Sequence, residues 1–184
     1  MSAAYNNAPT VRYKGLYDWM QSFVVFLVVI VLLLSFVGQV IGVEQASMSP
    51  TLLEGDRMIV RSVFYTPRHN DVVVFARHDF QEGAMVVKRV IGLAGDVIDI
   101  DTSSGFVYRN GVALSESFTS GPTNTAGNMT YPFTVPEGHV FVIGDNRNNS
   151  LDSRHVSIGA VDEREIIGVV VAVALPFGRA GLVR

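Results

Sequence analysis

Ser47 and Lys88 are the residues of this sequence whose types and placement could provide a nucleophile and its base. A serine hydroxyl becomes an effective nucleophile only when a neighbouring base takes its proton. A buried lysine can serve as that base, whereas Arg89 beside it cannot lose its proton in a protein. On composition alone Ser49 is as good a nucleophile as Ser47, and the segment that holds both is also typical of a simple turn.

The segment around Lys88 is typical of a β-strand. Alternate residues of a strand share a face, so Lys88 lies with Val86 and Val90, and Arg89 lies on the opposite face. Either face could be the buried one, and two solvated charges on a surface strand would fit the pattern too. A catalytic lysine would require the buried alternative.

A third segment, residues 144–154, concentrates polar groups. It contains Asp145, Asp152, two arginines that include Arg154, three asparagines, and Ser150. Such a composition predicts a hydrogen-bonded loop that could brace a site, and it is also typical of a polar surface turn.

The elements that position these residues begin with an uncharged run from Trp19 to Val43. A helix needs about 20 largely apolar residues to span a bilayer, and a cleaved signal peptide would have a shorter core. The sequence therefore predicts a tail over residues 1–18, a transmembrane helix over 19–43, and a second domain over 44–184. Arg12 and Lys14 favour a cytoplasmic N-terminus, although basic residues within about 20 positions of each end are tied.

After this run the pattern changes to short β-rich segments that are introduced by turn residues. They predict a mainly β fold, in which one N-terminal helix precedes an antiparallel domain that is sandwich-like or barrel-like. A hairpin is expected around Asn110 and Gly111. The predicted strands are 58–60, 72–75, 85–87, 97–100, 139–143 and 166–171.

Composition excludes several functional classes. The 184 residues carry a net charge of −3, so the chain lacks the excess of basic residues that is typical of proteins that bind nucleic acid. The absence of cysteine excludes disulfides, thiolate metal sites and a cysteine nucleophile. The four histidines show no metal-ligand spacing, so we expect no metal and no cofactor.

Three motifs in this order resemble those of bacterial type I signal peptidases, which are membrane-anchored serine–lysine peptidases. The resemblance covers nearly the whole chain. Its nucleophile motif is Ser-Met-x-Pro-Thr, its lysine motif is Lys-Arg-Val-Ile-Gly with a later Gly-Asp, and its third motif is Gly-Asp-Asn-Arg with Ser-x-Asp-Ser-Arg. Here they correspond to residues 47–51, 88–96 and 144–154.

The resemblance implies a serine endopeptidase that removes signal peptides from exported preproteins at the outer surface of the membrane. It selects Ser47 over Ser49 as nucleophile and makes Lys88 the general base. For that role the pKa of Lys88 must fall by roughly three units, or about 4 kcal/mol. Ser150 would orient the lysine amine, and the supporting residues that brace the loop would be Asp145, Asp152 and Arg154.

The resemblance also implies how substrate binds. A preprotein would add as a β-strand, with small side chains at the first and third positions before the cut. Those side chains would enter pockets lined by Val43, Met48, Leu52 and Val87, and Leu52 fits the role of an ordinary core residue nearly as well. Partners would be signal peptides and membrane lipid, with the secretion translocon as a further candidate. The protein would be a single-pass cell-membrane protein whose catalytic domain is extracytoplasmic.

The oxyanion site is where the sequence departs from the family pattern. Gln45 stands two residues before Ser47, where relatives usually have a small residue or serine. Its side-chain amide could be the second donor beside the Ser47 N–H, or it could point to solvent and leave that role to a backbone N–H or water.

Two other interpretations remain. Self-cleaving repressors of the LexA type share a Ser-Met motif and a lysine, but they would need a DNA-binding helical domain in place of the apolar run. A membrane-anchored β-domain that binds extended peptides without catalysis is the alternative from another class.

Overall fold

The computed structural model describes residues 14–37, 39–76 and 84–183, and the chain divides into two compact units. The first unit, Met1–Val37, contains one helix, α1 (Lys14–Val37). Across the described residues, the structure has no helix with both the length and the hydropathy of a membrane span. The second unit, Gly38–Arg184, is built mainly from antiparallel strands.

The bounds of the N-terminal helix differ from the predicted range of 19–43. α1 starts at Lys14 and ends at Val37, and the following residues form strand β1 (Gln39–Gly42). β1 pairs antiparallel with β2 (Arg57–Arg61), which satisfies its backbone hydrogen-bonding groups. The apolar sequence continues across this change from helix to strand, so hydropathy alone does not mark the boundary.

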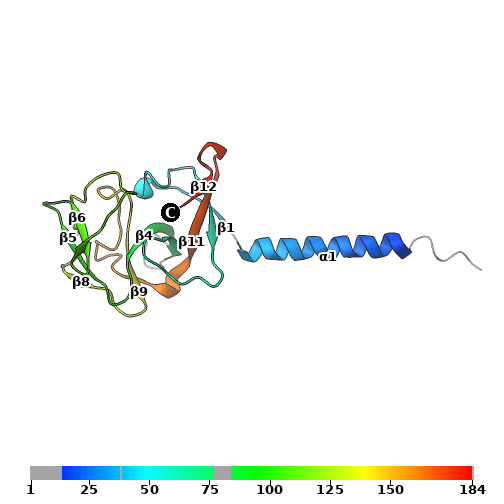
Figure 1. Ribbon diagram of the computed structural model, residues 1–184, viewed down its shortest axis with the longest axis horizontal. Helices are drawn as coiled ribbons and strands as arrows, with labels where there is room; N and C mark the ends of the chain where they lie inside the picture. Colours follow the sequence, from blue (N-terminus) through cyan, green and yellow to red (C-terminus); the bar gives the residue numbers. More distant parts are fainter. Residues whose placement is uncertain (1–13, 38, 77–83, 184) are drawn as a thin grey trace, which may run out of the picture. The chain divides into compact units, whose positions relative to one another are not determined.

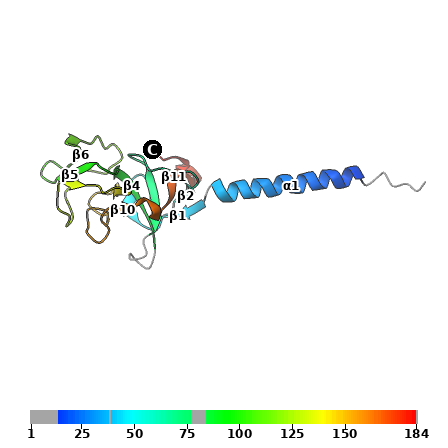
Figure 2. The ribbon, with the colours of Figure 1, turned by 90° about the horizontal axis from the view of Figure 1, so that it is seen from below.

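The second unit contains an eight-stranded sheet and a four-stranded sheet. The larger sheet has the order β1-β2-β11-β3-β4-β9-β10, with β12 paired to β11, and the smaller one has the order β7-β6-β5-β8. Within this unit, β5 and β6 lie at one end and β1 and β11 at the other (Figures 1 and 2). The remaining strands of the larger sheet are β3 (Val72–Ala76), β4 (Met85–Gly92), β9 (His139–Ile143), β10 (Val161–Asp162), β11 (Ile166–Leu175) and β12 (Gly181–Leu182).

The smaller sheet contains the predicted hairpin. Asn110 and Gly111 have φ of 54° and 78°, the left-handed values that a two-residue hairpin turn requires. This prediction is confirmed, and so are the six predicted strands, which lie within β2, β3, β4, β5, β9 and β11. The strands of this sheet are β5 (Val97–Asp101), β6 (Phe106–Arg109), β7 (Val112–Ala113) and β8 (Phe133–Thr134).

Strand β4 pairs with β3 and β9 along its two edges, and side chains on both of its faces are buried. Lys88 is 1% exposed and Arg89 is 0% exposed, although their side chains leave the strand on opposite faces. The alternation of side chains along the strand could not predict which face is buried, because both faces are buried. Short 3₁₀ helices connect the strands: η1 (Ala46–Met48), η3 (Glu163–Glu165) and η4 (Phe177–Arg179).

Candidate active site

Ser47 lies in η1, the single 3₁₀ turn that follows β1. Its carbonyl oxygen accepts a hydrogen bond from the Asn146 backbone N–H at 3.0 Å, and the Asn146 side chain donates to the Ala46 carbonyl at 3.2 Å. The segment that holds the serine is therefore attached to the loop that begins at Gly144. Ser47 is only 9% exposed, so most of its surface is covered by the rest of the protein.

The structure brings Lys88 to Ser47. The Lys88 Nζ donates to Ser47 Oγ at 2.7 Å and to the Val87 carbonyl at 3.0 Å. Burial lowers the pKa of Lys88 from 10.5 to about 8; Asp152 opposes this effect, Arg154 adds to it, and Asp145 opposes it. About a tenth of the amine is then neutral at pH 7, so this side chain can accept a proton near neutral pH.

Asp145 forms a buried ion pair with Arg89. The guanidinium donates to both carboxylate oxygens at 2.8 and 2.7 Å, and both side chains are fully buried. The Thr51 hydroxyl also donates to Asp145, and Arg89 packs over the Phe118 ring with its guanidinium carbon 4.0 Å from the ring centre. Arg89 thus joins β4 to the loop, a role that the sequence analysis did not give it. Its burial explains the pairing, since a buried arginine requires an anionic partner.

Asp152 and Arg154 form a second buried pair within the same loop. Arg154 donates to both Asp152 oxygens at 2.8 Å, and the Gly144 backbone N–H donates to Asp152 at 3.0 Å. Burial would raise the pKa of Asp152, but the hydrogen bonds and charge of Arg154 hold that pKa below its usual value. The loop therefore carries a fixed carboxylate and a fixed guanidinium near Lys88.

Ser150 lies in the loop but does not bond to the lysine amine. Its buried Oγ has no hydrogen bond of normal geometry within the described part of the chain, although its proximity to Asp152 helps to lower the pKa of that carboxylate. Ser150 packs against Gly144, where an added Cβ would lie 2.2 Å from its Oγ and 2.5 Å from the Ser47 carbonyl oxygen. The predicted hydrogen bond from Ser150 to Lys88 is thus not formed in this structure.

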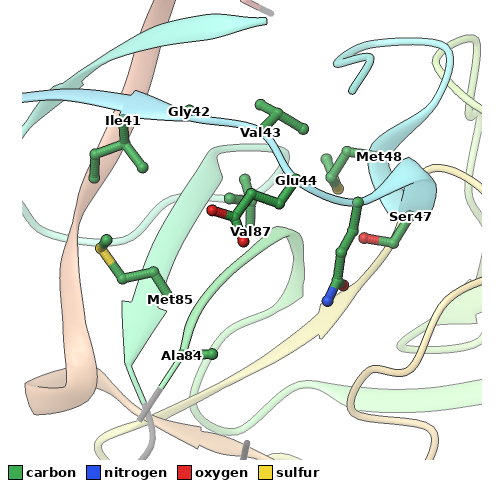
Figure 3. Close-up of a pocket in the computed structure, with 10 residues that line it drawn as sticks. Ile41, Gly42, Val43, Glu44, Ser47, Met48, Ala84, Met85 and Val87 are labelled. Carbon is green, nitrogen blue, oxygen red and sulfur yellow. The ribbon is translucent and has the colours of Figure 1, made fainter. Parts of the chain in front are cut away.

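A cavity of about 360 Å³ opens beside Ser47 (Figure 3). Val43, Met48 and Val87 line it, as predicted for the substrate pockets. Leu52 does not line it; this residue is 0% exposed and packs in the hydrophobic core with Met58. Gln45, the oxyanion candidate, lines it too, and the lining residues that were not predicted are Ile41, Gly42, Glu44, Ala84 and Met85.

A second cavity, of about 500 Å³, lies on another side of Ser47 and is lined in part by residues 148–151. Gln45 and Ser47 border both cavities. Gln45 precedes η1 in an extended conformation, with φ of −131° and ψ of 149°, and its exposed side chain does not cap the turn. The nucleophile candidate therefore borders two cavities.

We expect Asp152→Asn and Arg154→Gln to move the pH dependence of kcat/KM in opposite directions. Burial dominates the lowered pKa of Lys88, but Asp152 raises that pKa and Arg154 lowers it. Loss of the carboxylate should move the rising limb to lower pH, and loss of the guanidinium should move it to higher pH. Each change also leaves a buried charge unpaired, which costs about 3–5 kcal/mol of unfolding free energy.

Rate profiles between pH 6 and 10 and urea unfolding measure these effects. Asp162→Asn is the matched control, because Asp162 pairs with the exposed Arg164 away from the dyad. A shift in the same direction for Asp152→Asn and Arg154→Gln would contradict the electrostatic account.

Comparison with known proteins gives the family. The model of a family described as "Signal peptidase, peptidase S26" matches residues 16–175. The signal peptidase I of Bacillus licheniformis is 32% identical over 178 residues, which cover 91% of this chain and 93% of the relative. The probable signal peptidase I-1 of a Synechocystis strain is 37% identical over 167 residues, covering 85% and 81%.

A solved structure gives a further comparison. The crystal structure of a signal peptidase I from Enterococcus faecalis V583 is 34% identical and covers 57% of this chain and 97% of its own, with a TM-score of 0.45. The family model spans most of the chain, and it includes Ser47, Lys88 and the whole loop from Gly144 to Arg154. This chain belongs to the signal peptidase family, peptidase S26.

Proposed function

We propose that this chain removes signal peptides from exported preproteins and that Ser47 and Lys88 carry the reaction. Signal peptidase I activity follows from its family. The observation that supports the residue assignment is the 2.7 Å hydrogen bond between Lys88 Nζ and Ser47 Oγ. A neutral amine can accept the hydroxyl proton across that distance, which lies within the reach that general base catalysis needs.

In the proposed first step, Ser47 Oγ attacks the scissile carbonyl carbon while its proton passes to Lys88 Nζ. The new C–O bond moves the carbonyl electron pair onto oxygen, which gives a tetrahedral oxyanion. When the oxyanion collapses, the C–N bond breaks and the Lys88 ammonium gives its proton to the departing amine. Water then attacks the acyl-enzyme with Lys88 as base, which releases the signal peptide and restores Ser47.

The Ser47 backbone N–H is the proposed first donor to this oxyanion. The first N–H groups of a helical turn have no partner within the turn, and Ser47 lies in the first turn of η1. Gln45 borders both cavities, so its side chain remains a candidate for the second donor. A fall in kcat of about 10²–10³ in Gln45→Ala would assign it that role, and a change of a few-fold would leave a backbone amide or water.

We further propose that the N-terminal segment is a single membrane anchor with a cytoplasmic N-terminus, which places the catalytic unit outside. The support is the uncharged sequence from Trp19 to Val43 and the basic residues Arg12 and Lys14 before it. Ser47 follows Val43, the last residue of this uncharged run, by four positions, so the chain itself limits how far the nucleophile can lie from the run. Membrane lipid and the secretion translocon are the partners that fit this placement.

A truncated chain tests the anchor. We expect residues 38–184 to cleave short soluble peptides and to process membrane-held preproteins poorly, because truncation removes co-localisation and not the dyad. The cut should precede β1, since its residues pair with β2 from Gln39↔Val60 to Gly42↔Arg57. Gel assays with preprotein in vesicles and with soluble peptide give the comparison. Equal processing of vesicle-bound preprotein by both forms would contradict the tethering proposal.

A further inference from the structure

Glu44 places a carboxylate in the cavity beside Ser47. Of the described residues that line this cavity, Glu44 is the charged one, and its walls are otherwise mainly apolar, with Val43, Met48 and Val87 among them. Figure 3 shows the Glu44 side chain turned toward Val87 and the wall that carries Met85. A single negative charge in a mainly apolar cleft gives a bound peptide one electrostatic contact that discriminates between its side chains.

This carboxylate is not used to hold the protein together. Glu44 is exposed and forms no hydrogen bond or ion pair with its side chain among residues 14–37, 39–76 and 84–183. Asp145 and Asp152 differ, because each is fully buried and bound by an arginine through both of its oxygens. The charge of Glu44 is thus available to a bound ligand.

The geometry of an extended substrate indicates which of its side chains can reach Glu44. Small side chains at the first and third positions before the cut would face the pockets walled by Val43, Met48 and Val87. Successive side chains of a strand point to opposite faces, so those at the second and fourth positions leave the pocket side, and only a long side chain there can turn back over the cavity mouth, where Glu44 is exposed. Glu44 stands three residues before Ser47, which is at most about 10 Å of extended chain. Lysine and arginine are the basic side chains long enough to turn back toward the carboxylate.

We propose that Glu44 makes this enzyme favour preproteins with a basic side chain at the second or fourth residue before the cut, and disfavour acidic ones there. The proposal rests on the proposed function, because the cavity must hold the segment that precedes the cut. Glu44 acts on specificity and does not touch the reacting atoms. Its contribution should appear in KM with little change in kcat, since a remote ion pair binds substrate and transition state alike.

The expected size of the preference is modest because the cleft is open to solvent. Exposed ion pairs change a binding constant by only a few-fold. We expect kcat/KM for lysine at the second position to exceed that for glutamine about threefold and that for glutamate about tenfold, since the acidic peptide adds repulsion. Salt should reduce these ratios, because solvent-exposed charges are screened over a Debye length of about 8 Å at physiological ionic strength.

The test uses the full-length chain and peptides of the form Ala-x-Ala before the cut, with lysine, glutamine or glutamate at x. A parallel set places the same three residues at the fourth position. Glu44→Gln should bring the lysine-to-glutamate ratio at the responsive position close to one, and Glu44→Lys should invert it. Glu54→Gln is the matched control, because Glu54 is also exposed but does not line this cavity, and it should leave the ratio unchanged.

The outcomes separate this inference from the proposed function. If wild type cuts the glutamine peptide but shows a lysine-to-glutamate ratio near one at both positions, the Glu44 proposal is overturned and the peptidase assignment stands. A preference that survives unchanged in Glu44→Gln also overturns it. Failure of wild type to cut any of these peptides would overturn the proposed function and this inference together.

Discussion

Ser47→Ala is expected to reduce kcat/KM for an Ala-x-Ala peptide by about 10⁴- to 10⁶-fold, the loss typical when a nucleophile is removed from a serine peptidase. The reason is that no other described hydroxyl is hydrogen-bonded to the Lys88 amine. The substitution removes only the hydroxyl oxygen of Ser47, so the protein should remain folded. Peptide cleavage by chromatography and thermal unfolding measure the two properties.

Ser49→Ala is the control for this experiment. Ser49 lies two residues further on, and its backbone N–H donates to the Ala46 carbonyl at 3.1 Å, which a substitution by alanine preserves. This variant should retain most activity. Loss of activity in Ser49→Ala together with survival in Ser47→Ala would reassign the nucleophile.

Lys88→Arg is expected to be as inactive as Ser47→Ala although it keeps the positive charge. A guanidinium stays protonated in a protein, so it cannot take the Ser47 proton. The larger head group must also fit where the lysine is 1% exposed and already bonded to Ser47 and the Val87 carbonyl. The measurement is kcat/KM beside circular dichroism, which verifies that the variant is folded.

Lys14→Arg is the matched control for this prediction, because Lys14 and Lys88 are the two lysines of the sequence. It should cleave soluble peptides as wild type does. An active Lys88→Arg would show that the base is another group and would remove the lysine from the mechanism.

The sequence predicted the site well where motif and chemistry agreed. The resemblance of the motifs paired Ser47 with Lys88, and the structure places the two side chains in direct contact. Asp152 and Arg154 were expected to brace the loop, and the structure pairs them with each other. These contacts depend on which groups can bond, and that is encoded in residue type, whereas the catalytic roles of the residues stay predictions.

Predictions that depended on tertiary pairing were less successful. The helix was extended to Val43 because β1 carries the same apolar character, and only its pairing with β2 marks it as a strand. Leu52 was placed in the substrate pocket, but an apolar residue near a site can equally join the core, as it does here. The Arg89–Asp145 bond joins a strand to a loop 56 positions later, a distance at which sequence spacing gives no register.

The pH dependence of kcat/KM tests the central claim most directly, because this ratio reports the essential groups of the free enzyme. Only the neutral amine can take the Ser47 proton, so activity should rise with pH as Lys88 loses its own. The burial that lowers the pKa of Lys88 to about 8 predicts a rising limb with its midpoint near that pH. A limb centred near the ordinary lysine value of about 10.4, or no rise between pH 6 and 10, would contradict the account.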